Sequence, residues 1–275
     1  MWIDDYCKLC LIYSRTKDLV ELGCSSKLPS LLRYLAEALA MNSRSLAFTE
    51  SFNYLKELVE SEDPYVARKN ELRKVGVELA GSARRYLESA NWSVKEALRI
   101  SAAANIIDTS VLGYQFNGDL SRVMWDKPIV EELINLPKDE VIYLIPDNAG
   151  EVELDKLLAE ALVRNGHNVA IVVRESSYEI DVTAQDLGNE VSIPVIRTPG
   201  NRSPVMFIDS GFIIAKGIAN AEAYLEFGMV NSLHLFRAKC DVISRYIGVP
   251  KNSAIIISGE SLRKLLSRSS SITLN

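Results

Sequence analysis

Residues 143–173 read YLIPDNAGEVELDKLLAEALVRNGHNVAIVV, and this stretch carries the clearest structural pattern in the chain. An apolar run leads into Asp147 and Asn148, a helical pattern follows, and a second apolar run ends the stretch. This order predicts a strand, a helix and a second strand. Ligands of open α/β sheets bind at the carboxyl ends of the strands, beside helix amino termini that favour anions. The two oxygen-bearing side chains at that edge therefore suggest a hard metal ion and a phosphate.

Five short, β-rich apolar runs lie in the second half of the chain, separated by helical or loop segments. They are VIYLIP (141–146), NVAIVV (168–173), PVMFID (204–209), SLHLF (232–236) and AIIIS (254–258). Strands that alternate with helices predict a mostly parallel sheet. Residues 136–275 are therefore predicted to form a Rossmann-like α/β domain, in which RTPGNRSP (197–204) is a loop.

The front of the chain, residues 1–135, is predicted to be an all-helical domain that precedes the α/β domain. Two sets of apolar residues recur there at helical spacing, as on helices that face a core. The sets are Leu28, Leu31, Leu32, Leu35 and Leu39, and Leu72, Val75, Leu79, Ala83 and Leu87.

Charge and hydropathy exclude several classes of partner. The chain has 31 basic and 36 acidic residues, a net charge of -5, and no basic run, so a nucleic-acid partner is not expected. No apolar stretch approaches the roughly 20 residues of a membrane span, and the amino terminus MWIDDYCKLC lacks the basic residues of a signal peptide. We therefore expect a cytoplasmic protein without a membrane partner. The sequence specifies no oligomeric state.

The four cysteines are too few and too scattered for a disulfide framework, so free thiols are expected. Cys7 and Cys10 have the two-residue gap of metal and redox motifs, but no second such pair follows, and both histidines are remote in sequence. Two interpretations stay open. The pair forms a zinc or redox site, or it supplies small buried apolar groups on the first helix. We expect the structural role, at a domain interface.

Four polar clusters follow the predicted strands. Their members are Asp147, Asn148 and Glu151; Asp181, Thr183 and Asp186; Lys216 and Asn220; and Lys239. Two acids and an amide, faced by two lysines, suit a divalent cation that holds a phosphate. Each cluster also has a structural interpretation, as a helix cap, a turn or a surface charge. Their shared placement at the ligand-binding edge of the sheet favours function.

Short segments in a characteristic order extend over nearly the whole chain. They are CKLC (7–10), DPY (63–65) followed by Lys69, NIID (105–108), DNAGE (147–151), DVTAQD (181–186), SGFIIAKGIANAE (210–222) and AKC (238–240). This set resembles the metal-dependent damage-control phosphatases, a family long catalogued as a domain of unknown function. The CxxC and KGxxN motifs resemble its stand-alone microbial subfamily.

The resemblance implies a helical domain on a Rossmann-like domain, and metal-dependent hydrolysis of phosphomonoesters. The implied substrates are small phosphorylated metabolites: sugar phosphates, phosphopantetheine-like compounds and damaged metabolites. Asp147, Asn148 and Asp181 would be the catalytic metal ligands. The substrate would be bound by Glu151, Lys216, Gly217, Asn220 and Lys239. Similar proteins have Asn directly before the third ligand, where this chain has Ile180, so an amide that could contact the substrate is lost.

The oxygen ligands favour Mg or Mn because these ions are hard, and Co or Ni also bind such sites because affinity rises along the first-row series. The metal would polarise a phosphoryl oxygen and activate water, while Lys216 and Lys239 would contact the phosphate from the opposite side. An aspartyl-phosphate route of the haloacid-dehalogenase type needs a second Asp two residues after Asp147. That position is Ala149, which favours direct attack by water.

Two other functions remain as alternatives. An S-adenosylmethionine-dependent carboxyl methyltransferase would use a Rossmann-like domain, but the glycine-rich loop that such enzymes place after the first strand is missing. A non-catalytic protein that binds phosphorylated metabolites is the second alternative. P-loop and dinucleotide enzymes are disfavoured because GxxxxGK and GxGxxG are absent.

Overall fold

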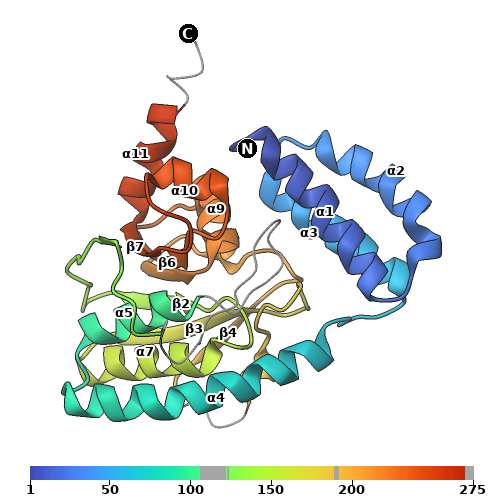
Figure 1. The fold of residues 1–275 in the computed structure, drawn as a ribbon. Coiled ribbons are helices and arrows are strands. Elements are labelled where there is room, and N and C mark those ends of the chain that lie inside the picture. The colour runs from blue at the N-terminus through green and yellow to red at the C-terminus, as the bar shows by residue number, and fades with distance from the viewer. Residues whose placement is uncertain (106–121, 123, 189–191, 270–275) are drawn as a thin grey trace.

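A computed structural model describes residues 1–105, 122, 124–188 and 192–269 of the chain (Figure 1). The first three helices, α1 (Asp5–Glu21), α2 (Leu28–Leu39) and α3 (Arg44–Val59), form a bundle, with a short 3-10 helix, η1 (Ser25–Lys27), between α1 and α2. An apolar core that includes Leu11, Leu31, Leu35 and Phe52 holds the bundle together. This confirms the helical amino-terminal region. The predicted all-helical range of residues 1–135 is wrong at its end, because Val130–Glu131 forms a strand, β1, that joins the sheet.

The prediction is wrong for one residue of the apolar face of α2. Leu31 and Leu35 are fully buried, whereas Leu32 is 45% exposed. Successive residues of an α-helix point about 100° apart, so Leu32 cannot share the inward direction of Leu31.

The next two helices leave the bundle and cover the sheet. Helices α4 (Val66–Ser89) and α5 (Val94–Ala104) pack on α7 (Val152–Arg164) and share one core with residues of the central strands. This packing crosses residue 135. The division into domains 1–135 and 136–275 therefore stays a prediction about which parts of the chain fold as units.

Within the described residues the sheet has seven strands in the order β1-β7-β6-β5-β2-β3-β4. Every neighbouring pair is parallel except β6 with β7, which confirms the predicted mostly parallel α/β fold. The strands are β1 (Val130–Glu131), β2 (Val141–Ile145), β3 (Asn168–Arg174), β4 (Val195–Thr198), β5 (Phe212–Lys216), β6 (Ser232–Arg237) and β7 (Ala254–Ser258).

The predicted strand PVMFID is wrong, because Pro204–Phe207 forms a 3-10 helix, η2. The Ser203 hydroxyl accepts a hydrogen bond from the Val205 backbone N–H at 3.4 Å, and Pro204 occupies the first turn, as is common at helix starts. The real strand, β5, begins only at Phe212. The loop predicted over 197–204 is also partly wrong, because its first two residues end β4.

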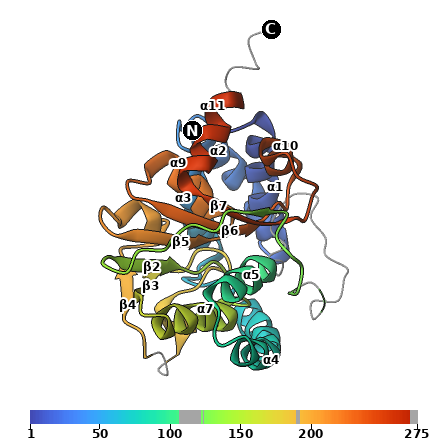
Figure 2. The same cartoon turned by 90° about the vertical axis from the view of Figure 1, so that its left-hand side faces the viewer.

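Helices cover both faces of the sheet (Figure 2). Helices α4, α5 and α7 lie on one face, and α9 (Ile218–Phe227), α10 (Asp241–Ile247) and α11 (Gly259–Ser269) lie on the other. A single turn, α8 (Ala184–Leu187), follows β3, and the amino-terminal bundle contacts α9 through α3. Among the described helices, none combines the length and apolar character that a bilayer crossing requires.

Candidate active site

The loops after β2 and β3 meet and bring the three predicted metal ligands together. Asn148 and Asp181 form an isolated antiparallel bridge. The Val182 N–H donates to the Asp147 carbonyl at 2.8 Å, and the Ala149 N–H donates to the Ile180 carbonyl at 3.0 Å. The backbone thus fixes Asp147, Asn148 and Asp181 beside one another at the carboxyl ends of the strands. The Ile180 side chain, at the position of the missing amide, is buried.

These loops lie at the switch point of the sheet. The chain continues from β2 to β3 on one side, while β5 pairs with the other side of β2. Such a reversal opens a crevice where open α/β sheets bind their ligands. Asp147 at the end of β2 therefore faces Gly217 at the end of β5.

Gly217 is required by this close approach. Its φ of +79° lies in the left-handed region, and a Cβ at this position would collide with the Asp147 carboxylate. The glycine of the KGIAN motif thus makes room for the carboxylate that is predicted to bind the metal.

We expect Gly217→Ala to displace the Asp147 carboxylate and to abolish most turnover. Gly166→Ala is the matched control, because Gly166 has a φ of +81° but nothing within 4 Å of the added Cβ. Both variants should lose about 1–3 kcal/mol of unfolding free energy, because alanine is strained at a positive φ, and Gly217→Ala should lose more because its added Cβ also collides with Asp147. Only Gly217→Ala should lose activity in assays of the folded proteins. Equal activity of the two variants would contradict this account.

Asn105, the last residue before the first undescribed stretch, orients two of the acids. Its amide Nδ2 donates to Asp147 Oδ2 at 2.8 Å and to both Glu151 oxygens at 3.1 Å, and its Oδ1 accepts from the Arg237 N–H at 3.1 Å. Asn105 is the first residue of the NIID segment, whose other residues, 106–108, lie outside the described residues. No sequence pattern at Asn105 indicates this role.

Glu151 is fully buried behind the three predicted ligands. Besides Asn105, its carboxylate accepts hydrogen bonds from the Asn148 amide and from Lys216 Nζ, the latter at 2.9 Å. The Gly150 N–H donates to Asn148 Oδ1 at 3.0 Å. The Asn148 amide is therefore fixed at both its nitrogen and its oxygen.

Lys216 is fully buried, and its ammonium group lies 2.9 Å from Glu151 Oε2 and 2.7 Å from Asp155 Oδ1. Burial acts to lower the pKa of Lys216, but the two carboxylates outweigh it and raise the pKa, so the lysine stays charged. This geometry argues against the predicted direct contact with phosphate. Asp155 was missed, although it lies one helical turn after Glu151 on the same face of α7.

Asn220 is also held within the protein. Its Nδ2 donates to the Lys216 carbonyl at 2.9 Å, and its Oδ1 accepts from the Ser203 hydroxyl at 2.7 Å. Of these residues, Ser203 lines the pocket described next. Asn220 therefore supports the turn after β5, and its contact with the substrate stays a prediction.

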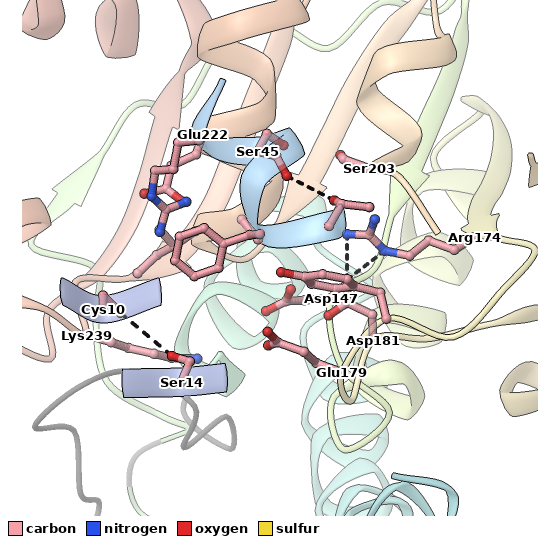
Figure 3. Close-up of a pocket in the computed structure, with 16 residues that line it drawn as sticks. Cys10, Ser14, Ser45, Asp147, Arg174, Glu179, Asp181, Ser203, Glu222 and Lys239 are labelled. Atoms are coloured by element: carbon pink, nitrogen blue, oxygen red, sulfur yellow. Dashed lines mark hydrogen bonds and ion pairs between the residues drawn. The ribbon is translucent and has the colours of Figure 1, made fainter. Parts of the chain in front are cut away.

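A pocket lies between this edge of the sheet and the amino-terminal bundle (Figure 3). The α/β part contributes Asp147, Arg174, Asp181 and Lys239 among others, and the bundle contributes Cys10, Ser14, Arg44, Ser45 and Thr49. Arg174 binds Asp181 Oδ2 through Nε at 2.8 Å and through Nη2 at 2.7 Å. The pocket thus combines two predicted metal ligands with three cationic side chains.

Thr183 and Asp186, which follow the same strand as Asp181, have structural roles. They form a capping box at the start of α8. Lys69 lies 3.0 Å from Asp186 Oδ2 and 2.6 Å from Asp63 Oδ2. The DPY segment and Lys69 therefore tie the start of α4 to the loop that carries Asp181.

The structure modifies the interpretation of the cysteine pair. Cys7 is buried, as expected, but Cys10 lines the pocket together with Asp147 and Lys239. Its sulfur lies 4.0 Å from the Ser14 hydroxyl. Cys10 is therefore close to the site in space although it is far from it in sequence.

The donor chemistry at the sheet edge fits a hard divalent cation. Asp147 and Asp181 supply carboxylates and Asn148 supplies an amide oxygen, the ligand types that Mg and Mn prefer. Across the described ranges, no group of three or more His, Cys, Asp or Glu side chains is arranged to hold a metal ion. A metal bound here would therefore need the Asn148 oxygen as well as the two carboxylates.

Known proteins resemble this chain in sequence and fold. Residues 15–193 match the damage-control phosphatase ARMT1-like domain. A damage-control phosphatase of Archaeoglobus fulgidus is 26% identical over 217 residues, which cover 70% of this chain and 75% of the relative. Another, of Pyrococcus horikoshii, is 26% identical over 245 residues, which cover 81% and 82%. The crystal structure of a DUF89 family protein from P. horikoshii has a TM-score of 0.77 at 24% identity, over 94% of this chain and 99% of that one.

Proposed function

The chain belongs to the damage-control phosphatase ARMT1-like domain family, and we propose that it is a metal-dependent phosphatase of small phosphorylated metabolites. The observation that carries the proposal is the bridge between Asn148 and Asp181, which places two carboxylates and an amide at the switch point of the sheet. The relatives named damage-control phosphatase support the same activity.

Asp147, Asn148 and Asp181 would hold a divalent cation, which would polarise a phosphoryl oxygen and activate a water molecule. Asn105 and Glu151 hold two of these ligands in place through the hydrogen bonds described above. Preorganisation of this kind matters because ligand displacements of about 1 Å are enough to slow catalysis strongly.

Lys239 is the lysine that lines the pocket together with Asp147 and Asp181. We assign to it the charge stabilisation of the phosphoryl oxygens, which carry the developing charge in phosphoryl transfer. Lys216 supports Glu151 from behind. Water would attack the phosphorus and break the bond to the ester oxygen, which leaves as the alcohol. The alternative route through an aspartyl-phosphate on Asp147 is disfavoured, because Ala149, two residues later, is a buried apolar residue where that route needs an acid.

The methyltransferase alternative is not favoured. The turn after β2 buries Asp147 and Glu151, and their charge would repel the carboxylate of S-adenosylmethionine. The relatives reported above carry phosphatase names instead.

The direct test is a phosphatase screen over sugar phosphates, phosphopantetheine-like compounds and other small phosphomonoesters. The protein is first treated with EDTA, and Mg, Mn, Co and Ni are then supplied separately. We expect release of inorganic phosphate that depends on the added metal. Absence of turnover with every metal, or full turnover in EDTA, would contradict the proposal.

A further inference from the structure

A second pocket adjoins the first. The two share four lining residues, Cys10, Arg44, Ile218 and Glu222. The second cavity has a volume of about 460 Å³, against about 90 Å³ for the first. Pockets that bury a whole small molecule typically measure about 300–1,000 Å³. The first pocket therefore has room for a phosphate-sized group, and the second has room for the rest of a substrate.

The inner wall of the second pocket is neutral. It consists of three thiols and two aliphatic side chains, namely Cys7, Cys10, Cys240, Ile218 and Val242. Burial raises the pKa of Cys7, and it raises the pKa of Cys240 to about 11, so these two thiols stay protonated at neutral pH. A protonated thiol is a small apolar group and a poor nucleophile. This chemistry argues against Cys7 as the nucleophile of a redox site.

The charged side chains of the second pocket are paired. At its mouth, Arg245 pairs with Asp4 at 3.3 Å and Lys251 pairs with Asp241 at 3.1 Å. At the boundary with the first pocket, Arg44 of α3 forms an ion pair with Glu222 of α9. Because these charges already have partners, the space between them suits an uncharged ligand.

Arg44 also offers one polar contact. Its Nε is buried and has no hydrogen-bond partner among the described residues. A buried donor without a partner costs free energy, which an acceptor on a bound ligand would recover. Arg44 lines both pockets, so a small movement of its guanidinium group would bring this donor to a ligand that extends from one pocket into the other.

We propose that the second pocket binds the non-phosphate end of the substrate, and that the CxxC motif and Cys240 form its apolar wall. The proposal rests on the proposed function. The substrate class is an elongated phosphomonoester: the phosphate lies at the sheet edge, a hydrogen-bond acceptor lies beside Arg44, and an uncharged, largely apolar segment lies among the thiols. A compact sugar phosphate would leave the second pocket empty.

The test uses n-alkylphosphonates from methyl to hexyl, which carry the anionic group but no ester bond to hydrolyse. Their binding to the whole protein is measured by calorimetry in the presence of Mn. Each methylene buried in an apolar site contributes about 0.8 kcal/mol, so affinity should rise about threefold to fourfold per methylene. An affinity that does not depend on the length of the alkyl chain would overturn the proposal about the second pocket and leave the proposed phosphatase function standing. Absence of binding by every phosphonate would overturn the proposed function as well.

Two variants show where the alkyl chain of the phosphonate binds. Val242→Trp should fill the second pocket and remove the dependence on chain length. Cys240→Ser keeps the side-chain cap of α10, which Cys240 now provides through its sulfur, but makes the wall polar, so the rise per methylene should become smaller. Cys24→Ser is the matched control, because Cys24 lines neither pocket, and it should keep the full rise. An unchanged rise in Val242→Trp would overturn the proposal.

Discussion

Asp147→Asn should bind Mn far more weakly than the native protein and lose phosphatase activity by on the order of a thousandfold, the upper range for removal of one preorganised electrostatic group. The substitution keeps the shape of the side chain and an oxygen that accepts the hydrogen bond from Asn105, but it removes the negative charge that a divalent cation requires. The measurements are a Mn titration by calorimetry and kcat/KM with the best substrate of the screen.

Asp186→Asn is the control for this variant. Asp186 belongs to the same loop as Asp181, but its carboxylate is bound to Lys69 and caps α8. We therefore expect Asp186→Asn to lower stability, because a buried ion pair loses one partner, while the folded molecules still bind Mn. If Asp147→Asn retains full metal-dependent turnover, the assignment of Asp147 as a ligand is wrong.

Much of the fold follows from local sequence patterns. The unit of β2, α7 and β3 was predicted because two apolar runs flank a helical stretch, and both strands are observed within one residue of the predicted bounds. The error at PVMFID has a local cause. Two apolar, β-rich runs, 204–209 and 212–216, lie close together, and the side-chain cap and Pro204 in the first turn make the first of them a 3-10 helix.

The site could be predicted only in part. The positions of Asp147, Asn148 and Asp181 after predicted strands indicated that they meet at one edge of the sheet. The bundle side of the pocket, such as Ser14 and Arg44, could not be predicted, because it depends on how helices distant in sequence pack against the sheet. Helical periodicity shows which face of a helix is buried but not what the rest of the helix faces.

The surroundings of Lys216 show why the position of a lysine at a strand end does not determine what its side chain contacts. Side chains of a strand alternate between the two faces of the sheet, so Lys216 points to the same face as Ile214. Ile214 packs in the core formed with α4, α5 and α7. Lys216 is therefore directed towards α7, where Glu151 and Asp155 lie. The alternation of side chains along β5 thus places Lys216 in the protein interior.

The free energy of unfolding of Lys216→Met should consequently be about 3–5 kcal/mol lower than that of the native protein. This is the cost of leaving buried charges without their partner. Both Glu151 and Asp155 would lose the ammonium group that now lies within 2.9 Å of each. Adding Asp155→Asn removes one of these uncompensated charges, so the double variant should be less destabilised than the sum of the two single changes predicts. Denaturant unfolding of the four proteins gives the coupling free energy.

Lys239→Met should behave differently, because Lys239 lines the pocket. Its kcat/KM should fall on the order of a hundredfold at a metal affinity close to that of the native protein, as expected when one group that stabilises the transition state is removed. The comparison separates a lysine that holds the site together from one that contacts phosphate. A lysine that only balances buried carboxylates cannot be removed without a loss of stability. The assignment would therefore be wrong if Lys216→Met were as stable as the native protein and lost as much kcat/KM as Lys239→Met. Lys216 would then be a direct phosphate ligand.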